Sequence, residues 1–375
     1  MAIDNKEKEV LNVPHLRFPE FSGEWNKYTI NDLATVVGGG TPDTTVKSYW
    51  GGDIQWFTPS EIGKNKYVDF SKRTITRDGL DNSSAKLLPL HTILLSSRAT
   101  VGECSIASNE CTTNQGFQSL IAKQCNIDFL YYLIQTKKKD LIRNACGSTF
   151  LEISANEIRK IKVAVPVQNE QEQIAKLLSL IDERIATQNK IIDKLQSLIK
   201  GIAQNITCSN KPNVHISECL ECSSSTLQES DVFEHGAYPV YGANGIVGYL
   251  DNYNTENEAV YIIKDGSGVG TVSYVTGKCS ATGTLNILQA PNGYSLRYLY
   301  YLLKVFNFEP YKTGMAIPHI YFKDYGKAKI FCPLYSEQLK YATLLSTIDD
   351  KLSTEQDILK SLNLEKQYLL CQMFI

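Results

Sequence analysis

Two cysteines with the spacing of zinc ligands are the first residues in this sequence that could do chemistry. Cys219 and Cys222 are separated by two residues, with Cys208 and His215 nearby, a pattern typical of structural zinc sites. The ISECLEC segment that contains them aligns, however, with INDLATV at residues 30–36, which has apolar residues at both cysteine positions. We therefore predict two buried thiols rather than a metal site.

Motifs for catalysis or nucleotide binding are weak. Residues 266–270 are rich in glycine, but they match neither GxGxxG nor a Walker lysine motif. Their counterpart in the first half is RATVG, so a tight turn is expected. Glu61 and Lys64 resemble part of a nuclease site without a convincing acidic partner, and no Asp/Asn-Pro-Pro-Tyr methyltransferase signature occurs. The residues favour a non-catalytic chain.

The elements that must position these residues include a long helix, which the sequence predicts over residues 167–206. Its apolar residues recur every seven positions in two series, interrupted once by Gln188: Leu178, Ile185, Ile192, Ile199, Ile206 and Ile174, Ile181, Leu195, Ile202. Such a heptad seam predicts a coiled coil with a second long helix. About 39 helical residues would span roughly 58 Å.

The second helix lies in the same chain, at residues 333–375. Shifting the sequence by 167 residues places it on the first helix without a gap, with Pro333 on Pro166 and Glu337-Gln338 on Glu170-Gln171. Its seam consists of Tyr341, Leu345, Ile348, Leu352, Leu359, Leu362, Leu369 and Met373, interrupted by Glu355 and Lys366. This agreement indicates an internal duplication.

The segments before each helix also repeat. Short alternating apolar runs bounded by Gly, Pro and Asp predict strands, followed by a helix over residues 127–143 whose FLYYLIQ segment matches YLYYLLK at 298–304. The repeated tyrosines are interpreted as framework packing. We therefore predict an α+β fold: an N-terminal segment (1–27), a globular domain (28–166), the first helix, a second globular domain (207–332) and the last helix.

The two helices are expected to run antiparallel about a pseudo-two-fold axis. Gln188 lies near the middle of its helix and should then oppose Glu355, its repeat mate, so that the two polar residues set the register. The alternative is two solvated positions at a loosely packed seam.

Several phrases resemble the specificity subunit of Type I restriction-modification enzymes: LRFPEF (16–21), YWGGDIQWFTPSEI (49–62), TTNQGF (112–117) and YPVYGANGIVGYLD (238–251). The resemblance covers essentially the whole chain. It implies two target-recognition domains, each reading one half of a bipartite double-stranded DNA sequence. It also implies helices that act as a spacer and dock two methyltransferase subunits, with motor-nuclease subunits joining for cleavage. S-adenosylmethionine, ATP and Mg²⁺ would belong to those partners, and this chain would need no cofactor.

The charge is low for a free-standing DNA binder, with a formal net charge of −2. Residues 28–166 carry 16 Lys and Arg against 13 Asp and Glu, and residues 207–332 carry 9 against 11. The second domain must therefore place a few cations well, or borrow phosphate contacts from partner subunits. The runner-up interpretation is a protein-assembly scaffold with duplicated ligand-binding domains, and a stand-alone enzyme is third.

The candidate DNA-binding residues are basic or polar groups on loops that differ between the halves, since Arg and Lys suit guanine and Asn and Gln suit adenine. Each could instead be a solvated charge or a turn residue. In the first domain they are Lys64, Lys66, Lys72, Arg73, Arg98, Asn114, Gln115, Ser148 and Thr149; in the second, Tyr241, Asn244, Lys264, Lys278, Lys312 and His319. No segment has the apolar length of a signal peptide or a membrane span, so a cytoplasmic protein with reduced cysteines is expected.

Overall fold

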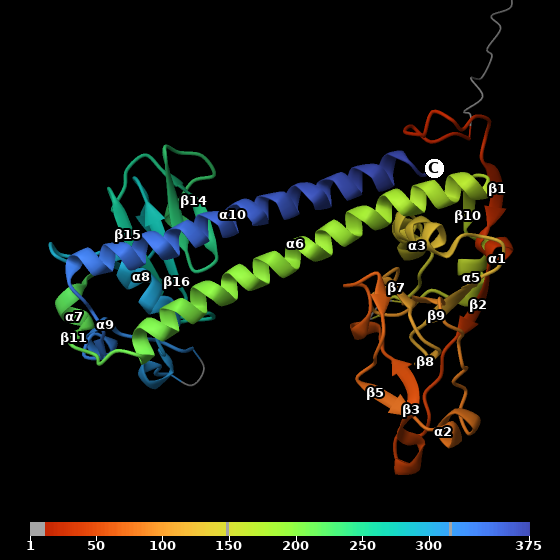
Figure 1. Cartoon of the computed structure of the whole chain (residues 1–375), viewed down its shortest axis with the longest axis horizontal. Helices are drawn as coiled ribbons and strands as arrows, with labels where there is room; N and C mark the ends of the chain where they lie inside the picture. The colour runs from red at the N-terminus through yellow and green to blue at the C-terminus, as the bar shows by residue number, and fades with distance from the viewer. Residues whose placement is uncertain (1–11, 148–149, 315–316) are drawn as a thin grey trace, which may run out of the picture. The chain divides into compact units, whose positions relative to one another are not determined.

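The computed structural model describes residues 12–147, 150–314 and 317–375 (Figure 1). The chain divides into two compact units. The first runs to Thr187 and includes Leu359–Ile375, and the second is Gln188–Ile358. Each unit combines one globular domain with a part of each long helix. Among the described helices, none has the length and apolar character required to cross a bilayer.

Three sheets build the described part of the first unit. β1 (Asn26–Thr29) pairs antiparallel with β10 (Lys162–Val165). The largest sheet has the strand order β2 (Ala34–Gly38), β9 (Gln118–Ala122), β6 (Ile93–Leu95), β7 (Cys104–Ala107), β4 (Tyr67–Val68). The third has the order β5 (Arg73–Ile75), β3 (Trp50–Phe57), β8 (Cys111–Thr113), in which β3 and β8 are parallel. The helices are α1 (Ile30–Leu33), α2 (Arg77–Asp81), α3 (Ile127–Thr136), α4 (Lys138–Arg143) and α5 (Ala155–Lys160), with short 3₁₀ turns at Lys47–Tyr49 and Pro59–Glu61.

The second unit repeats this plan. β11 (Val214–His215) pairs with β19 (Lys329–Ile330). The larger sheet has the order β12 (Glu221–Ser224), β18 (Leu285–Gln289), β15 (Glu258–Ile263), β16 (Val272–Thr276), and the three-stranded sheet has the order β14 (Gly245–Leu250), β13 (Tyr238–Gly242), β17 (Ser280–Ala281). β13 and β17 are again parallel. The helices are α7 (Ile216–Cys219), α8 (Leu296–Val305) and α9 (Phe322–Tyr325), with 3₁₀ turns at Glu229–Asp231 and Glu309–Tyr311. The predicted duplication is thus confirmed at the level of topology.

The long helices are α6 (Gln168–Cys208) and α10 (Tyr335–Gln372). Within the first unit, Lys366 of α10 forms an ion pair with Asp182 of α6 at 2.7 Å. Within the second unit, Gln188 of α6 meets Glu355 of α10. At these two contacts the residue number rises along α6 and falls along α10. The helices therefore pack antiparallel, as predicted. The seam residues are buried or half-buried along both helices.

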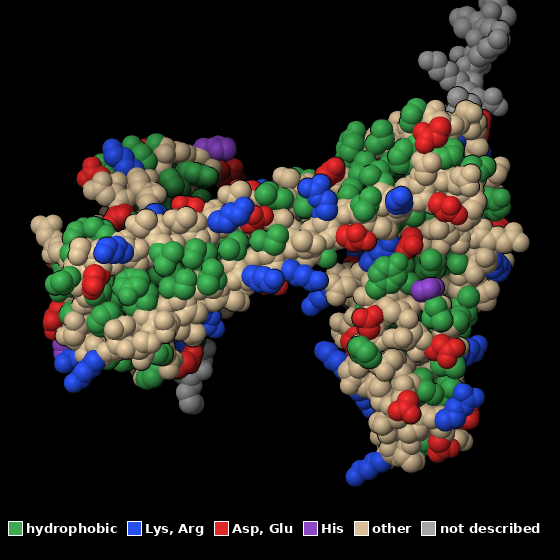
Figure 2. Space-filling view, viewed as in Figure 1, with side chains coloured by type: hydrophobic (Ala, Val, Ile, Leu, Met, Phe, Trp, Pro, Cys, Tyr) green, Lys and Arg blue, Asp and Glu red, His purple; other side chains and the backbone are tan. Residues whose placement is uncertain are grey.

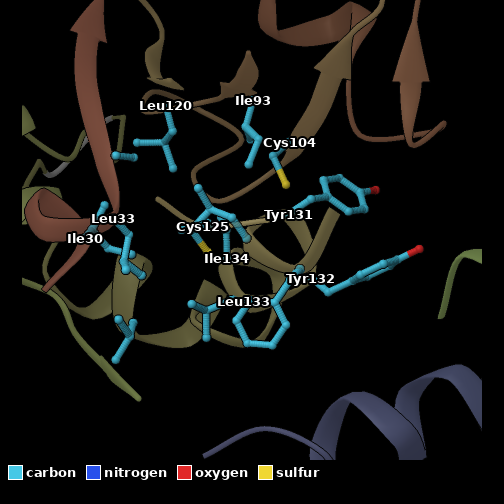
Figure 3. Packing of buried hydrophobic residues seen from close by; sticks show 14 of the residues in the cluster. Ile30, Leu33, Ile93, Cys104, Leu120, Cys125, Tyr131, Tyr132, Leu133 and Ile134 are labelled. Atoms are coloured by element: carbon cyan, nitrogen blue, oxygen red, sulfur yellow. The ribbon is translucent and has the colours of Figure 1, made fainter. Parts of the chain in front are cut away.

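Buried side chains from α1, α3 and the large sheet pack together in the core of the first unit (Figure 3), and residues of both long helices belong to the same cluster. Six consecutive residues of α3, Phe129–Ile134, are almost fully buried because the helix is covered on all sides. The residues that follow α10 complete this core, where Phe374 stacks on Phe129 with ring centroids 5.2 Å apart. The repeated tyrosines are buried in both units, as framework packing predicts.

The helix predicted over residues 127–143 is wrong in one respect, because it is divided into α3 and α4 at Lys137. The Lys137 N–H donates to the carbonyls of both Leu133 and Ile134, which tightens the last turn of α3. Its ammonium donates to the Ile375 carbonyl at 2.7 Å, and the next lysine, Lys138, pairs with Glu103. Two of the three consecutive lysines at 137–139 are therefore occupied within the unit.

One glutamine anchors the start of each long helix, and the two make the same kinds of contact. Gln171 accepts from the Asn126 N–H at 3.0 Å and donates to the Pro166 carbonyl. Gln338 accepts from the Ser295 N–H at 2.8 Å and donates to the Pro333 carbonyl. Since Asn126 and Ser295 are the N-caps of α3 and α8, each glutamine joins the long helix to the capped end of the aromatic helix.

Candidate nucleic-acid interface

The segment that follows β6 gathers several predicted site residues of the first unit. Ser97 donates its N–H to the Gly116 carbonyl at 2.9 Å, and its own carbonyl accepts from the Ile153 N–H at 2.9 Å. Arg98 is therefore held between the turn that contains Asn114 and Gln115 and the segment that begins at Phe150. Its guanidinium lies 3.6 Å from the carboxylate of Glu152, and both side chains are about half exposed.

The polar turn of this group is held by local hydrogen bonds. The Asn114 side chain accepts from the Gly116 N–H at 2.9 Å, and Gln115 accepts from the Thr41 hydroxyl. Gln115 is exposed and Asn114 is half-buried. Ser148 and Thr149, predicted in the same group, lie outside the described residues.

The segment that follows β15 makes the equivalent contacts in the second unit. Lys264 donates its N–H to the Thr284 carbonyl at 3.0 Å and accepts from the Ile320 N–H at 2.9 Å. The neighbouring Asp265 carboxylate lies 2.7 Å from His319 Nδ1. Tyr241 joins the group because its carbonyl accepts from the Thr282 N–H at 2.9 Å, and partial burial raises the pKa of its phenol.

The other two predicted residues near this group lie on exposed turns or pair locally. Asn244 is exposed in the turn between β13 and β14. Lys312 pairs with Glu309 at 2.6 Å, three residues away. Since Thr313 and His319 form a β-bridge, the Lys312 backbone lies next to the His319 group.

Two predicted cations stand over aromatic rings, Arg73 in the first unit and Lys278 in the second. The Arg73 guanidinium lies 3.6 Å from the centre of the Trp50 ring. The Lys278 ammonium lies 4.7 Å from the centre of the Tyr253 ring. Contact with the ring raises the pKa of Lys278, chiefly through the hydrogen bond with Tyr253. Cations held in this way keep their charge at the surface while losing side-chain freedom.

Lys66 has a structural role, contrary to its selection as a surface cation. Its side chain is 9% exposed and pairs with Asp128 at 2.7 Å. The ammonium also donates to the hydroxyls of Ser179 on α6 and Tyr132 on α3. Because these contacts use its donors inside the unit, Lys66 joins β4 to the helices. Lys64 and Lys72, by contrast, are exposed.

The Lys and Arg side chains of the first unit stand apart from one another in the face shown in Figure 2, with Asp and Glu between them. No continuous basic surface is visible on that face. This arrangement agrees with the near balance of charges in the sequence and favours recognition by a few placed groups over attraction by bulk charge.

Gln188 and Glu355 are the polar residues of the seam within the second unit. The Gln188 amide donates to the Glu355 carbonyl at 3.0 Å and also to its carboxylate. Lys351, one turn earlier on α10, pairs with the same carboxylate. The hydrogen bonds from Lys351 and then Gln188 lower the pKa of Glu355. The carboxylate is thus held charged at a nearly buried position.

The prediction of two buried thiols is confirmed for Cys219 and wrong for Cys222. Cys219 is fully buried, and burial raises the pKa of its thiol to about 12. Cys222 is only half-buried, because β12 lies at the edge of its sheet. Among the described residues, no group of three His, Cys, Asp or Glu side chains is arranged to hold a metal ion.

Sequence reasoning missed the tryptophans under Arg73 and a repeated contact between the aromatic and long helices. The Tyr132 hydroxyl donates to Asp182 at 2.6 Å, and the Tyr301 hydroxyl donates to Asp349 at 3.2 Å. Both members of each pair repeat in the sequence, so a search for repeated polar residues could have found them. The tryptophans belong to the YWGGDIQWF phrase, but nothing in the sequence joins them to Arg73.

Comparison with known proteins identifies the family. The family model described as "Type I restriction modification DNA specificity domain" matches residues 22–197 and 214–364. The MjaIX specificity subunit of Methanocaldococcus jannaschii is 39% identical over 183 residues, which cover 46% of this chain and 42% of that protein. The EcoprrI specificity subunit of Escherichia coli is 24% identical over 361 residues, 87% of each chain.

Solved structures agree on the fold. The crystal structure of a Type I restriction-modification S subunit from M. genitalium has a TM-score of 0.65 and 19% identity, and the match covers 97% of this chain and 99% of that one. A chain from a structure of Type I complex assembly and conformational transition has a TM-score of 0.54 and 14% identity. At these identities, the likeness supports the architecture alone.

Proposed function

This chain belongs to the Type I restriction modification DNA specificity family, and from that premise we propose that it supplies sequence recognition to a methylating complex. Each globular domain reads one half of a bipartite double-stranded DNA target. The two long helices set the distance between the half-sites and dock two methyltransferase subunits. Methyl transfer from S-adenosylmethionine belongs to those subunits, and ATP- and Mg²⁺-dependent cleavage belongs to motor-nuclease subunits.

The observation that carries the proposal is one backbone frame bearing two sets of side chains. The segments after β6 and β15 make matching hydrogen bonds to their neighbouring loops. The side chains differ: Arg98 and Glu152 in the first unit correspond to Asp265 and His319 in the second. A repeated scaffold with divergent exposed loops is what two domains that recognise different ligands require.

Methylome sequencing tests this function. The DNA of a host cell that produces the chain and its methyltransferase partner in its cytoplasm should carry a bipartite methylated motif. That motif should disappear when only this chain is deleted. Persistence of the motif after the deletion would remove the specificity role. DNA pull-down with and without the methyltransferase distinguishes DNA recognition from the scaffold alternative, because a protein scaffold would retain no DNA in either case.

Helix length offers a second test, directed at the spacer. Seven residues inserted at matching positions of α6 and α10 keep the seam in phase and add about 10 Å. If the helices set the spacing, the gap between half-sites should grow by roughly 3 base pairs. An unchanged gap in a folded, active variant would refute the spacer role.

A further inference from the structure

Arg73 is an exposed cation that the first unit holds flat against tryptophan. Its guanidinium carbon lies 3.6 Å from the centre of the Trp50 ring and 5.4 Å from that of Trp56. The two indoles meet edge to face, with centroids 5.0 Å apart. Cation–π attraction and stacking therefore restrict the orientation of the guanidinium before any ligand is present.

The platform beneath Arg73 is itself fixed. Trp56 lies opposite Arg73 in the ladder between β3 and β5, so the two side chains share one face of the sheet. The buried Trp56 indole donates to the Gly40 carbonyl at 2.9 Å, and the Trp50 indole donates to the Asp43 carbonyl at 3.1 Å. This sheet lies at the end of the first unit farthest from α6 (Figure 1).

Arg73 differs from most arginines of its unit because no carboxylate neutralises it among residues 12–147, 150–314 and 317–375. The paired arginines are Arg17, Arg77, Arg98 and Arg143, which meet Glu170, Asp81, Glu152 and Asp140. Stacking on Trp50 leaves the N–H donors at the edge of the Arg73 guanidinium without such a partner. A positioned, uncompensated fork of donors is suited to a planar acceptor pair.

We propose that Arg73 recognises guanine in the half-site read by the first domain, an inference that rests on the proposed function. The O6 and N7 atoms of guanine form an acceptor pair in the major groove that a guanidinium fork matches in two parallel hydrogen bonds. Trp50 acts as a positioning residue, because it orients the guanidinium without touching the base. Lys278, stacked on Tyr253, is a point cation without a fork, and the assignment does not extend to it.

The test uses the complex of the full chain with its methyltransferase subunits and the motif found for the wild type. Each guanine is replaced in turn by 7-deazaguanine, which pairs normally but lacks the N7 acceptor. The wild-type complex should lose affinity by about 5- to 150-fold at one guanine of one half-site. Arg73→Ala should bind the normal and modified DNA equally at that position and remain sensitive in the other half-site.

Two variants separate base recognition from a phosphate contact. Arg73→Lys keeps the charge, so the salt dependence of binding should stay near that of the wild type, while sensitivity to 7-deazaguanine should fall because an ammonium has no planar fork of donors. Trp50→Leu should weaken the discrimination more than Trp50→Phe, which keeps a ring. Thermal unfolding checks each variant, and Arg73→Met, which covers Trp50 without a hydrogen-bond donor, replaces Arg73→Ala in the comparison if the alanine variant unfolds early.

The matched control is Arg77→Ala, an exposed arginine of the same unit that pairs with Asp81, and it should leave the sensitivity at the Arg73-dependent guanine unchanged. If the wild-type complex binds its bipartite target but Arg73→Ala keeps the wild-type sensitivity to 7-deazaguanine at every guanine, the inference is overturned and the proposed function stays intact. The absence of any chain-dependent motif overturns the proposed function, and the inference with it.

Discussion

The segments that follow β6 and β15 have matching backbone hydrogen bonds but carry different side chains. In the first unit, Ser97 is buried and the next residue, Arg98, pairs with Glu152. In the second unit, Lys264 takes the place of Ser97, Asp265 takes the place of Arg98, and His319, in the place of Glu152, lies 2.7 Å from the Asp265 carboxylate. The duplicated frame has therefore kept its hydrogen bonds while its exposed side chains changed, with an aspartate in the second unit where the first has an arginine.

This comparison separates two kinds of residue in the chain. Residues that join the domain to the long helices repeat in identity and in contact: Gln171 and Gln338, Tyr132 and Tyr301, Asp182 and Asp349. Residues on the loops repeat only in position. Because helix packing tolerates little change while a solvated loop tolerates much, a duplicated protein can diverge in what it binds and keep how it is built.

The largest expected effect lies at a repeated glutamate whose surroundings differ. Glu170 is fully buried and meets Arg17 at 2.7 Å and the Trp25 indole at 3.2 Å, whereas its repeat mate Glu337 is exposed. Glu170→Ala should lower the free energy of unfolding by about 3 kcal/mol, because it leaves Arg17 without its partner. Urea unfolding measures the loss, and Glu337→Ala is the matched control with a change below about 0.5 kcal/mol. Equal losses at both sites would contradict the difference between the units.

A smaller, pH-dependent effect is expected at the polar pair of the seam. The folded pKa of Glu355 is lowered from its ordinary value of 4.5, mainly by Lys351 and then by Gln188. A lowered folded pKa contributes stability above the unfolded pKa, and that stability is lost as the pH falls through the folded pKa. The difference in unfolding free energy between the wild type and Glu355→Gln should therefore be full near pH 6 and shrink toward pH 3.

Urea unfolding at a series of pH values measures this difference. Glu337→Gln, an exposed substitution on the same helix, serves as the control and should show little pH-dependent difference from the wild type. A Glu355→Gln difference that stays constant from pH 6 to pH 3 would show that the carboxylate is not held charged by the seam.

The smallest effect on stability should come from replacing the Arg98–Glu152 pair by the residues of the Asp265–His319 pair. Arg98→Asp combined with Glu152→His places the pair of the second unit into the first. Both side chains are about half exposed, so the free energy of unfolding should change by less than about 0.5 kcal/mol. The methylome motif should nevertheless change in one half-site and remain in the other. A complex that keeps both half-sites unchanged would show that this ion pair has no part in recognition.

Much of the fold could be predicted from the sequence because its signals are periodic. The seven-residue spacing of apolar residues marks both long helices, and the shift of 167 residues exposes the duplication. These signals also place Gln188 opposite Glu355, as the structure has them, since antiparallel packing brings repeat mates near the centre together. Short strands such as β3 and β6 follow from apolar runs bounded by turn residues.

The candidate site could be predicted only as a set of loops. Arg98 and Lys66 are both basic residues in polar surroundings in the sequence, yet one is half exposed and the other is buried against α3 and α6. Where the helix breaks, Lys137 contacts Ile375 and Lys138 pairs with Glu103, both distant in sequence. No local pattern contains such partners.

By itself, the sequence determined the two long helices, the duplicated plan and the family, because periodicity and repetition are properties of a linear chain. Only the tertiary structure decided which charges are free to act. It buries Glu170 while Glu337 remains exposed, and it stacks Arg73 on Trp50. The physical reason is that burial, pairing and stacking depend on neighbours brought together by folding, and identical residues in a repeat acquire different roles when those neighbours differ.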